Sequence, residues 1–310
     1  MRTEQQALKL SLAGVLLVSA LGIGFGLFSG SFAILFDGVF SLVDAVMSIV
    51  SITLAGLIAK SASHELSRRT HDRFTMGFWH FEPIVLAVNA LLMMSVAAYA
   101  LFQAISALLS GGRDVEFGPA VVYAAVVVVL TFVIGLIEHR ANKKLDSALV
   151  AIDVKGWIMA GGVTSALLIA FLIGALIQGT DAEWLMPYID PAVLGVVALI
   201  LLPVPFSTLR RAVAEISLVT PPELKRQAEA AAGGVAESCG FLDYRVYAAQ
   251  QGRARTIDVV YYVPEGKGMR SLEEWDSIRD ETRAQLNGDD PHSWITVSFT
   301  TKTPPPQPRG

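Results

Sequence analysis

Six long apolar segments constrain the fold of this chain more than any other feature of its sequence. They lie at residues 7–29, 31–59, 80–109, 117–138, 148–177 and 186–207. Each reaches the ~20 residues that an α-helix needs to cross a hydrocarbon core of ~30 Å. Charged residues make up only 17% of the chain, whereas soluble domains contain about one quarter. We therefore predict six transmembrane helices in a lipid bilayer, the first of them a mature helix rather than a signal peptide.

The connecting segments carry very different numbers of basic residues, which predicts the orientation in the membrane. Arginine and lysine close to membrane helices favour the cytoplasmic side. One side of the predicted bundle carries Arg2, Lys9, Lys60, Arg68, Arg69, Arg73, Arg140, Lys143, Lys144, Arg210 and Arg211. The other side carries only Arg113, among several acidic residues. We expect both termini in the cytoplasm, a location in the inner (plasma) membrane and no nucleic-acid partner.

The composition changes from about Ser207, where a second domain begins. The predicted elements are a helix over PPELKRQAEAAAGGVAES after Thr220 as N-cap, strands DYRVYAAQQ and ARTIDVVYYVPE joined by a Gln/Gly turn, a helix over SLEEWDSIRDETRAQLNG and a strand HSWITVSFTTK. Ser271 and Glu274 have the spacing of a capping box. The order αββαβ is typical of a small α+β domain of ferredoxin-like type. We predict a transmembrane domain at 1–208, a cytoplasmic domain at 209–303 and a disordered tail at 304–310.

The second apolar segment contains two acids, Asp37 and Asp44. They are seven residues apart, close to two helical turns, so both lie on one helix face. An ionised carboxylate at membrane depth costs about 2.5 kcal/mol or more, and such residues usually have a function. The alternative is a structural ion pair, with partners at similar depth among Lys155, His80, Glu82 and Glu138. We favour a role in a cation or proton pathway.

Further polar residues accompany these acids. Ser41, Ser48 and Ser51 extend a polar stripe along the same segment, and their small size also suits close helix packing. Asp153 and Lys155 lie near the cytoplasmic start of the fifth segment and face different ways because they are two residues apart. For Lys155 two interpretations remain. It extends to the membrane interface, or it turns inward and pairs with an acid of the second segment.

Neither histidine nor cysteine forms a recognisable metal motif. The loop after the second segment carries His64, His71 and His80, whose spacing matches no compact ligand pattern. We interpret it as a solvated basic loop. The single Cys239 excludes an intramolecular disulfide and a Cys-based zinc site.

Two further acids precede prolines at the start of apolar segments, Glu82 before Pro83 and Asp190 before Pro191. An acid is favourable at a helix N-terminus because it opposes the positive end of the helix dipole. We expect both to serve the helix that they begin.

Four stretches resemble motifs of the cation diffusion facilitator family. They are SFAILFDGVFSLVD, FTMGFWHFEPIVLAVNALL, RANKKLDSALVAIDVK and IDPAVLGVVALILL. Their order and spacing match the family's second, third, fifth and sixth helices. The resemblance implies a homodimeric transporter that exports a divalent metal ion in exchange for protons and needs no cofactor.

The sequence departs from this family at the transport site. The family's tetrahedral site takes two residues from the second helix and two from the fifth. The matching positions here are Phe40, Asp44, Gly156 and Ala160, so only Asp44 is retained. The last strand, ITVSFTTK, also lacks the family's metal-binding His and Asp residues. We therefore expect no metal in the cytoplasmic domain.

The remaining acids suggest an atypical site. Asp37, Asp44 and Asp153, with Ser41 and backbone carbonyls, would form an all-oxygen site. Oxygen ligands favour Mg²⁺, Mn²⁺, Ca²⁺, a monovalent ion or a proton over zinc. Lys155 is an alternative internal cation that neutralises one acid.

Loss of three ligand positions also supports a different function, that of a transport-inactive regulatory or partner subunit. The chain contains no nucleophile–base arrangement, phosphate loop or cofactor fingerprint, so we expect no enzyme.

Overall fold

A computed structural model describes most of the chain. The described residues are 4–62, 73–74, 77–145, 148–266, 270–286, 288, 290 and 292–302. His64, His71 and the predicted disordered tail lie outside them. The chain divides into two compact units. Unit 1 comprises Met1–Val50 with Val88–Leu209, and unit 2 comprises Ser51–Ala87 with Arg210–Gly310.

The long apolar segments are helical, as predicted. They form α1 (Glu4–Ser29), α2 (Phe32–Ala62), α4 (Phe81–Leu109), α5 (Phe117–Leu145), α6 (Ala148–Ile177) and α7 (Met186–Leu201). Six helical spans in the described part are long and apolar enough to cross a membrane. The sixth span differs from the prediction because the helix is interrupted at Leu202–Pro203, after which α8 runs from Val204 to Ile216. Pro203 has no backbone N–H and cannot donate the hydrogen bond that would continue the helix, whereas Leu202 before it keeps helical dihedral angles.

The core of unit 1 is built around α5. This helix packs against α6 and α1, and α6 also packs against α1 and α7. Tyr123, Phe171 and Leu167 are buried in this core. Where α1 crosses α2, a Cβ atom on Gly22 would lie 2.6 Å from the Cα atom of Gly38, so only glycine allows this approach.

Asp190 has a different role from the expected one. Helix α7 begins at Met186, four residues earlier, so Asp190 is not at the N-terminus of its own helix. Its buried carboxylate instead caps α2. It accepts hydrogen bonds from the Ser31 hydroxyl at 2.5 Å, the Phe32 N–H at 3.1 Å and the Ala33 N–H at 3.2 Å. The expectation was wrong because a buried acid can serve a helix start that is distant in sequence.

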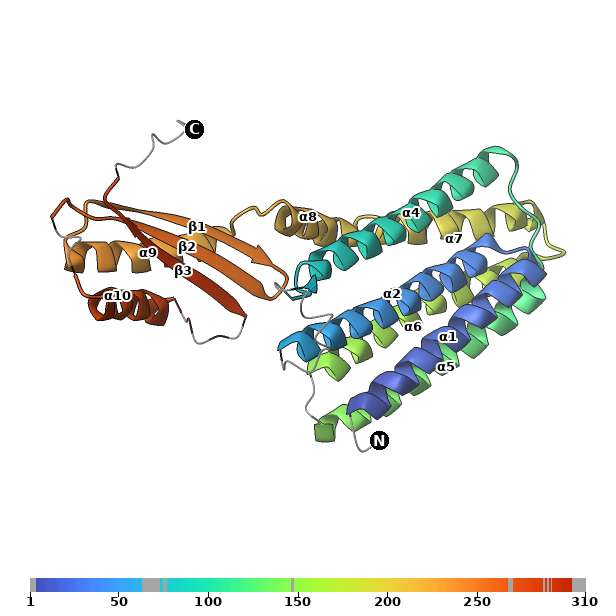
Figure 1. Ribbon diagram of the computed structural model, residues 1–310. Coiled ribbons are helices and arrows are strands. Elements are labelled where there is room, and N and C mark those ends of the chain that lie inside the picture. The colour runs from blue at the N-terminus through green and yellow to red at the C-terminus, as the bar shows by residue number, and fades with distance from the viewer. Residues whose placement is uncertain are drawn as a thin grey trace. The chain divides into compact units, whose positions relative to one another are not determined.

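The C-terminal part of unit 2 has the predicted order αββαβ. It contains α9 (Pro222–Cys239), β1 (Asp243–Gln251), β2 (Ala254–Tyr262), α10 (Leu272–Gln285) and β3 (Ser293–Thr300). The central strand β2 pairs antiparallel with β1 and parallel with β3. Both helices pack on the sheet and against each other (Figure 1). This confirms the small α+β domain.

The helix starts of this domain test the predicted caps. The Ser271–Glu274 capping box is present, with the Glu274 N–H donating to Ser271 Oγ at 3.3 Å and the Ser271 N–H to Glu274 Oε2 at 2.8 Å. Thr220 is not a cap. Pro221 occupies the N-cap position of α9, and the Thr220 hydroxyl donates to the Ala248 carbonyl at 2.6 Å. Because the Thr220 hydroxyl bonds to β1, it does not cap α9 as predicted.

The turn between β1 and β2 is held by two acids of unit 2. Glu82, in the first turn of α4 as expected, accepts the Arg253 N–H at 3.3 Å and pairs with the Arg253 guanidinium at 3.6 Å. Glu215 of α8 accepts the Gly252 N–H at 2.9 Å. Gly252 has a φ of +58°, and a Cβ there would lie 2.4 Å from Glu82 Oε2. The positive φ, together with the close approach of the Glu82 side chain, favours glycine at this turn.

Candidate functional site

Asp37 is held by a neighbouring helix. It lies in the second turn of α2 and is half-buried, and the hydroxyl of Tyr123 on α5 donates to its Oδ2 at 2.9 Å. Tyr123 itself is almost completely buried. The carboxylate therefore has a fixed direction and one polar partner, and a hydrogen bond of this kind strengthens when the acceptor is ionised.

Asp44 and Ser41 lie further along α2. Seven residues of helix raise Asp44 by ~10 Å relative to Asp37. Asp44 is exposed in the single chain, and Ser41 is partly exposed. Phe40, between the two acids, packs against the apolar core with its ring 5.5 Å from that of Phe36. The position that holds a ligand in the resembled family therefore has a packing role here.

Asp153 lies in a polar cluster that the sequence did not predict. It is half-buried on α6, next to Ser11 of α1 and Glu138 of α5. Ser11 accepts a hydrogen bond from the Trp157 indole N–H at 2.9 Å. Glu138 is completely buried, and neither of its carboxylate oxygens has a hydrogen-bond partner in the described part of the chain. Asp44 is within electrostatic reach of Asp153.

The predicted acids lie at two heights along the helix axes of unit 1. Tyr123, the partner of Asp37, and Glu138, the neighbour of Asp153, are both on α5 and are separated by ~22 Å of helix rise. Among the described residues, no three His, Cys, Asp or Glu side chains are close enough together to hold a metal ion. The structure thus brings Asp153 toward Asp44 but does not gather Asp37 with them. Joint binding of one ion by these three acids stays a prediction.

Lys155 and its neighbours face outward. Lys155 is exposed and forms no ion pair with a described acid. Gly156 and Ala160 are also exposed, and a Cβ on Gly156 would meet no atom within 4 Å. The arrangement matches the interpretation in which Lys155 extends away from the bundle, and it shows no inward pairing with Asp37 or Asp44.

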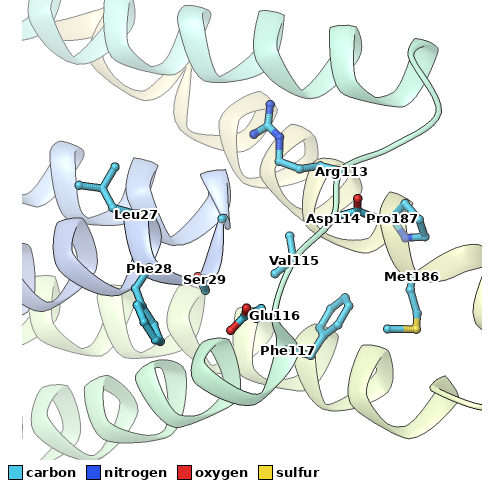
Figure 2. Close-up of a pocket in the computed structure, with 11 residues that line it drawn as sticks. Leu27, Phe28, Ser29, Arg113, Asp114, Val115, Glu116, Phe117, Met186 and Pro187 are labelled. Carbon is cyan, nitrogen blue, oxygen red and sulfur yellow. The ribbon is translucent and has the colours of Figure 1, made fainter.

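A cavity of about 400 Å³ lies at the end of unit 1 where α1 ends and α5 begins (Figure 2). The segment between α4 and α5 contributes Arg113, Asp114 and Glu116 to its lining. The Arg113 guanidinium lies 3.5 Å from the ring centre of Phe32. The Glu116 N–H donates to the Ser29 carbonyl at 3.0 Å, which fixes this segment to α1. The cavity lies at the end of the bundle where α5 begins. Along α5, this end is nearer to Tyr123, the partner of Asp37, than to Glu138.

Comparison with known sequences identifies the family. The sequence profile of the cation efflux transmembrane domain matches residues 8–217, which is more than half of the chain. The chain belongs to the cation efflux family. The matched range includes Asp37 with its partner Tyr123, the cluster of Glu138 and Asp153, and Asp44. The match confirms the resemblance to the cation diffusion facilitators.

Two relatives within this family share similarity with the chain. They are the metal cation efflux system protein CzcD of Cupriavidus metallidurans and the cation efflux system protein CzcD of an Alcaligenes species. Each is 30% identical over 205 residues, which is 64% of this chain and 58% of the relative. The chain thus spans less than two thirds of the length of either relative.

Two site residues of this cation efflux protein were not predicted from the sequence. Tyr123 is one tyrosine in an apolar run, and nothing local indicates that it pairs with Asp37. Glu138 ends the fourth apolar segment and was considered only as a partner for another acid. The position of Glu138 within an apolar segment was a usable signal, because an acid in a membrane span usually has a function.

Proposed function

We propose that this protein is a secondary active transporter that exports a divalent metal cation from the cytoplasm in exchange for protons. Family membership supports this proposal, and so do the six apolar spans. The relatives carry the name of cation efflux proteins. The observation that carries it is the presence of Asp37 and Asp44 within one apolar span and of Asp153 at the start of another. By the same resemblance the transporter is a homodimer in the plasma membrane with both termini in the cytoplasm.

The chemistry of exchange follows from carboxylates in a poorly solvated site. A carboxylate there is stabilised either by a bound cation or by a proton, so the two compete for the same oxygens. Binding of protons on one side of the membrane then releases the cation. Alternating exposure of the acids to the two sides, by movement of one group of helices against another, completes the cycle.

The available ligands define the class of ion. Asp44 and Asp153 supply oxygen, and Ser41 adds a hydroxyl close to Asp44 on α2. Phe40, Gly156 and Ala160 supply no side-chain ligand. Oxygen sites prefer hard cations such as Mg²⁺, Mn²⁺ and Ca²⁺ to zinc. We therefore propose a hard divalent cation as the substrate, with protons as the counter-ion and no bound cofactor.

Proton flux in vesicles tests this proposal. The protein is reconstituted with an internal pH dye, and Mg²⁺, Mn²⁺, Ca²⁺ and Zn²⁺ are added one at a time. We expect a hard cation to drive proton flux in the native protein, and Asp44→Asn to abolish it. Asp181→Asn, at an exposed position between α6 and α7, is the matched control and should retain flux. Absence of flux with every cation, or full flux in Asp44→Asn, contradicts the proposal.

A regulatory or partner subunit without transport activity is the second candidate. One observation favours it: three of the four ligand positions of the resembled family hold Phe40, Gly156 and Ala160. Calorimetric titration of the purified protein with each cation distinguishes the two functions. A transporter binds at least one cation, and Asp37→Asn or Asp44→Asn weakens that binding. Absence of binding for every cation supports the regulatory subunit.

A further inference from the structure

Glu138 is the most unusual polar group in unit 1. Its exposed fraction is 0%, and both carboxylate oxygens lack a hydrogen-bond partner in the described part of the chain. Buried polar groups in folded proteins are almost always satisfied, because an unpaired one loses its interactions with water and gains nothing in return. Among the described residues, Glu138 thus lacks the well-formed hydrogen bonds that a buried carboxylate normally accepts, and its nearest polar neighbours are Asp153 and Ser11.

The surroundings of Glu138 provide further oxygen ligands. Its carboxyl group lies next to Asp153 of α6 and Ser11 of α1, on three helices that pack against one another. The Ser11 oxygen already accepts the Trp157 indole N–H at 2.9 Å, which fixes its position. Ser11 and Trp157 are both nearly completely buried. The cluster thus has a rigid wall and at most five side-chain oxygens.

No lysine, arginine or histidine among the described residues forms an ion pair with this cluster. The ion pairs among the described residues include neither Glu138 nor Asp153. His139 and Arg140 follow Glu138 in the sequence but are exposed, as is Lys155. Asp44 of α2 is within electrostatic reach of Asp153, but among the described residues it does not gather with Asp153 and Glu138 into a cluster of three acids. Two adjacent carboxylates in an apolar bundle are stabilised by a divalent cation or by a proton that they share.

We propose that Glu138, Asp153 and Ser11 form a buried binding site for a hard divalent cation. The site lies on α1, α5 and α6, which are the first, fourth and fifth membrane spans. The ligand positions of the resembled family lie on the second and fifth spans, α2 and α6. The buried site rests on the proposed function, since it would hold the transported cation after Asp44. A divalent cation would balance the charge of both carboxylates at once, which a single shared proton does not. Carboxylate and hydroxyl ligands select Mg²⁺, Mn²⁺ or Ca²⁺, with water completing the coordination.

Binding of Mn²⁺ to the full-length protein in detergent tests the site. Free and bound Mn²⁺ are separated by electron paramagnetic resonance, which gives the affinity and the number of ions per chain. We expect Glu138→Gln to weaken binding at least about 10-fold or to remove one ion per chain. Ser11→Ala should weaken it a few-fold. Glu183→Gln, at an exposed position before α7, is the matched control and should bind like the native protein.

Folding and transport measurements separate the possible failures. Glutamine has the shape of glutamate, and an unchanged elution volume and thermal midpoint show that Glu138→Gln folds. Native-like Mn²⁺ binding in a folded Glu138→Gln overturns the site, whether or not the protein transports cations. Absence of Mn²⁺, Mg²⁺ and Ca²⁺ binding to the native protein also overturns it and favours a shared proton. Binding that depends on Glu138 without flux for any cation supports the site and contradicts the transporter.

Discussion

Asp190 and Glu138 are both completely buried carboxyl groups in unit 1, and their surroundings are opposite. Asp190 accepts three hydrogen bonds at the N-terminus of α2, from a hydroxyl and two backbone N–H groups. Glu138, between α1, α5 and α6, accepts none from the described residues. The difference teaches that burial alone does not identify a functional acid. Asp190 completes the fold, whereas we propose that Glu138 binds a cation from outside the chain.

Removing the satisfied acid should have the largest effect on stability. Asp190→Ala leaves the Phe32 and Ala33 N–H groups and the Ser31 hydroxyl without their acceptor. Each unsatisfied group costs about 1 kcal/mol, so the free energy of unfolding should fall by about 3 kcal/mol. Unfolding of the protein in detergent micelles by added SDS measures this change. A loss below about 1 kcal/mol would contradict the capping role.

For Glu138, the expected effect is a change in how strongly Mn²⁺ stabilises the protein. Mn²⁺ at a hundred times its dissociation constant should raise the free energy of unfolding of the native protein by about 2.7 kcal/mol. Glu138→Gln should lose most of this increase, and Asp190→Asn should retain it. The same SDS titration, with and without Mn²⁺, measures both. An equal increase in Glu138→Gln would remove the distinction between the two acids.

Asp37 is intermediate, because it has one hydrogen-bond partner. Tyr123→Phe removes the hydroxyl donor and keeps the ring in the core, so we expect a loss of about 1 kcal/mol. If Asp37 also takes part in transport, the same variant should slow proton flux. Tyr99→Phe, at an exposed position on α4, is the matched control. Unchanged stability and flux would show that the Asp37–Tyr123 bond contributes to neither.

The smallest effect is expected for Glu138→Gln in the absence of divalent cations. Since the neutral amide removes a buried charge that has no ion-pair partner among the described residues, the free energy of unfolding should equal or exceed the native value. A loss of 2 kcal/mol or more would mean that the native carboxylate has a structural partner.

The fold was largely predictable because its signals are local. Lengths of apolar segments determine spanning helices, and turn and capping residues mark the elements of the C-terminal domain. The Ser271–Glu274 capping box illustrates this, since its two residues are three positions apart. The break at Leu202–Pro203 was missed because the apolar composition continues through it.

The site was only partly predictable because its contacts connect distant helices. The hydrogen bond between Asp37 and Tyr123 joins residues 86 positions apart, and that between Ser31 and Asp190 joins residues 159 apart. A single sequence contains no local signal for either. The acids were identified from their depth in apolar segments, but their partners depend on how the helices pack.

Locating Mn²⁺ directly in a crystal of the full-length protein gives the most direct test of whether unsatisfied acids hold the cation. Anomalous scattering from Mn²⁺ marks its position independently of any assumed ligands. We predict a peak about 2.0–2.6 Å from carboxylate oxygens of Glu138 and Asp153, and none at Asp190. A peak at another set of residues, or its absence at saturating Mn²⁺, would contradict this account.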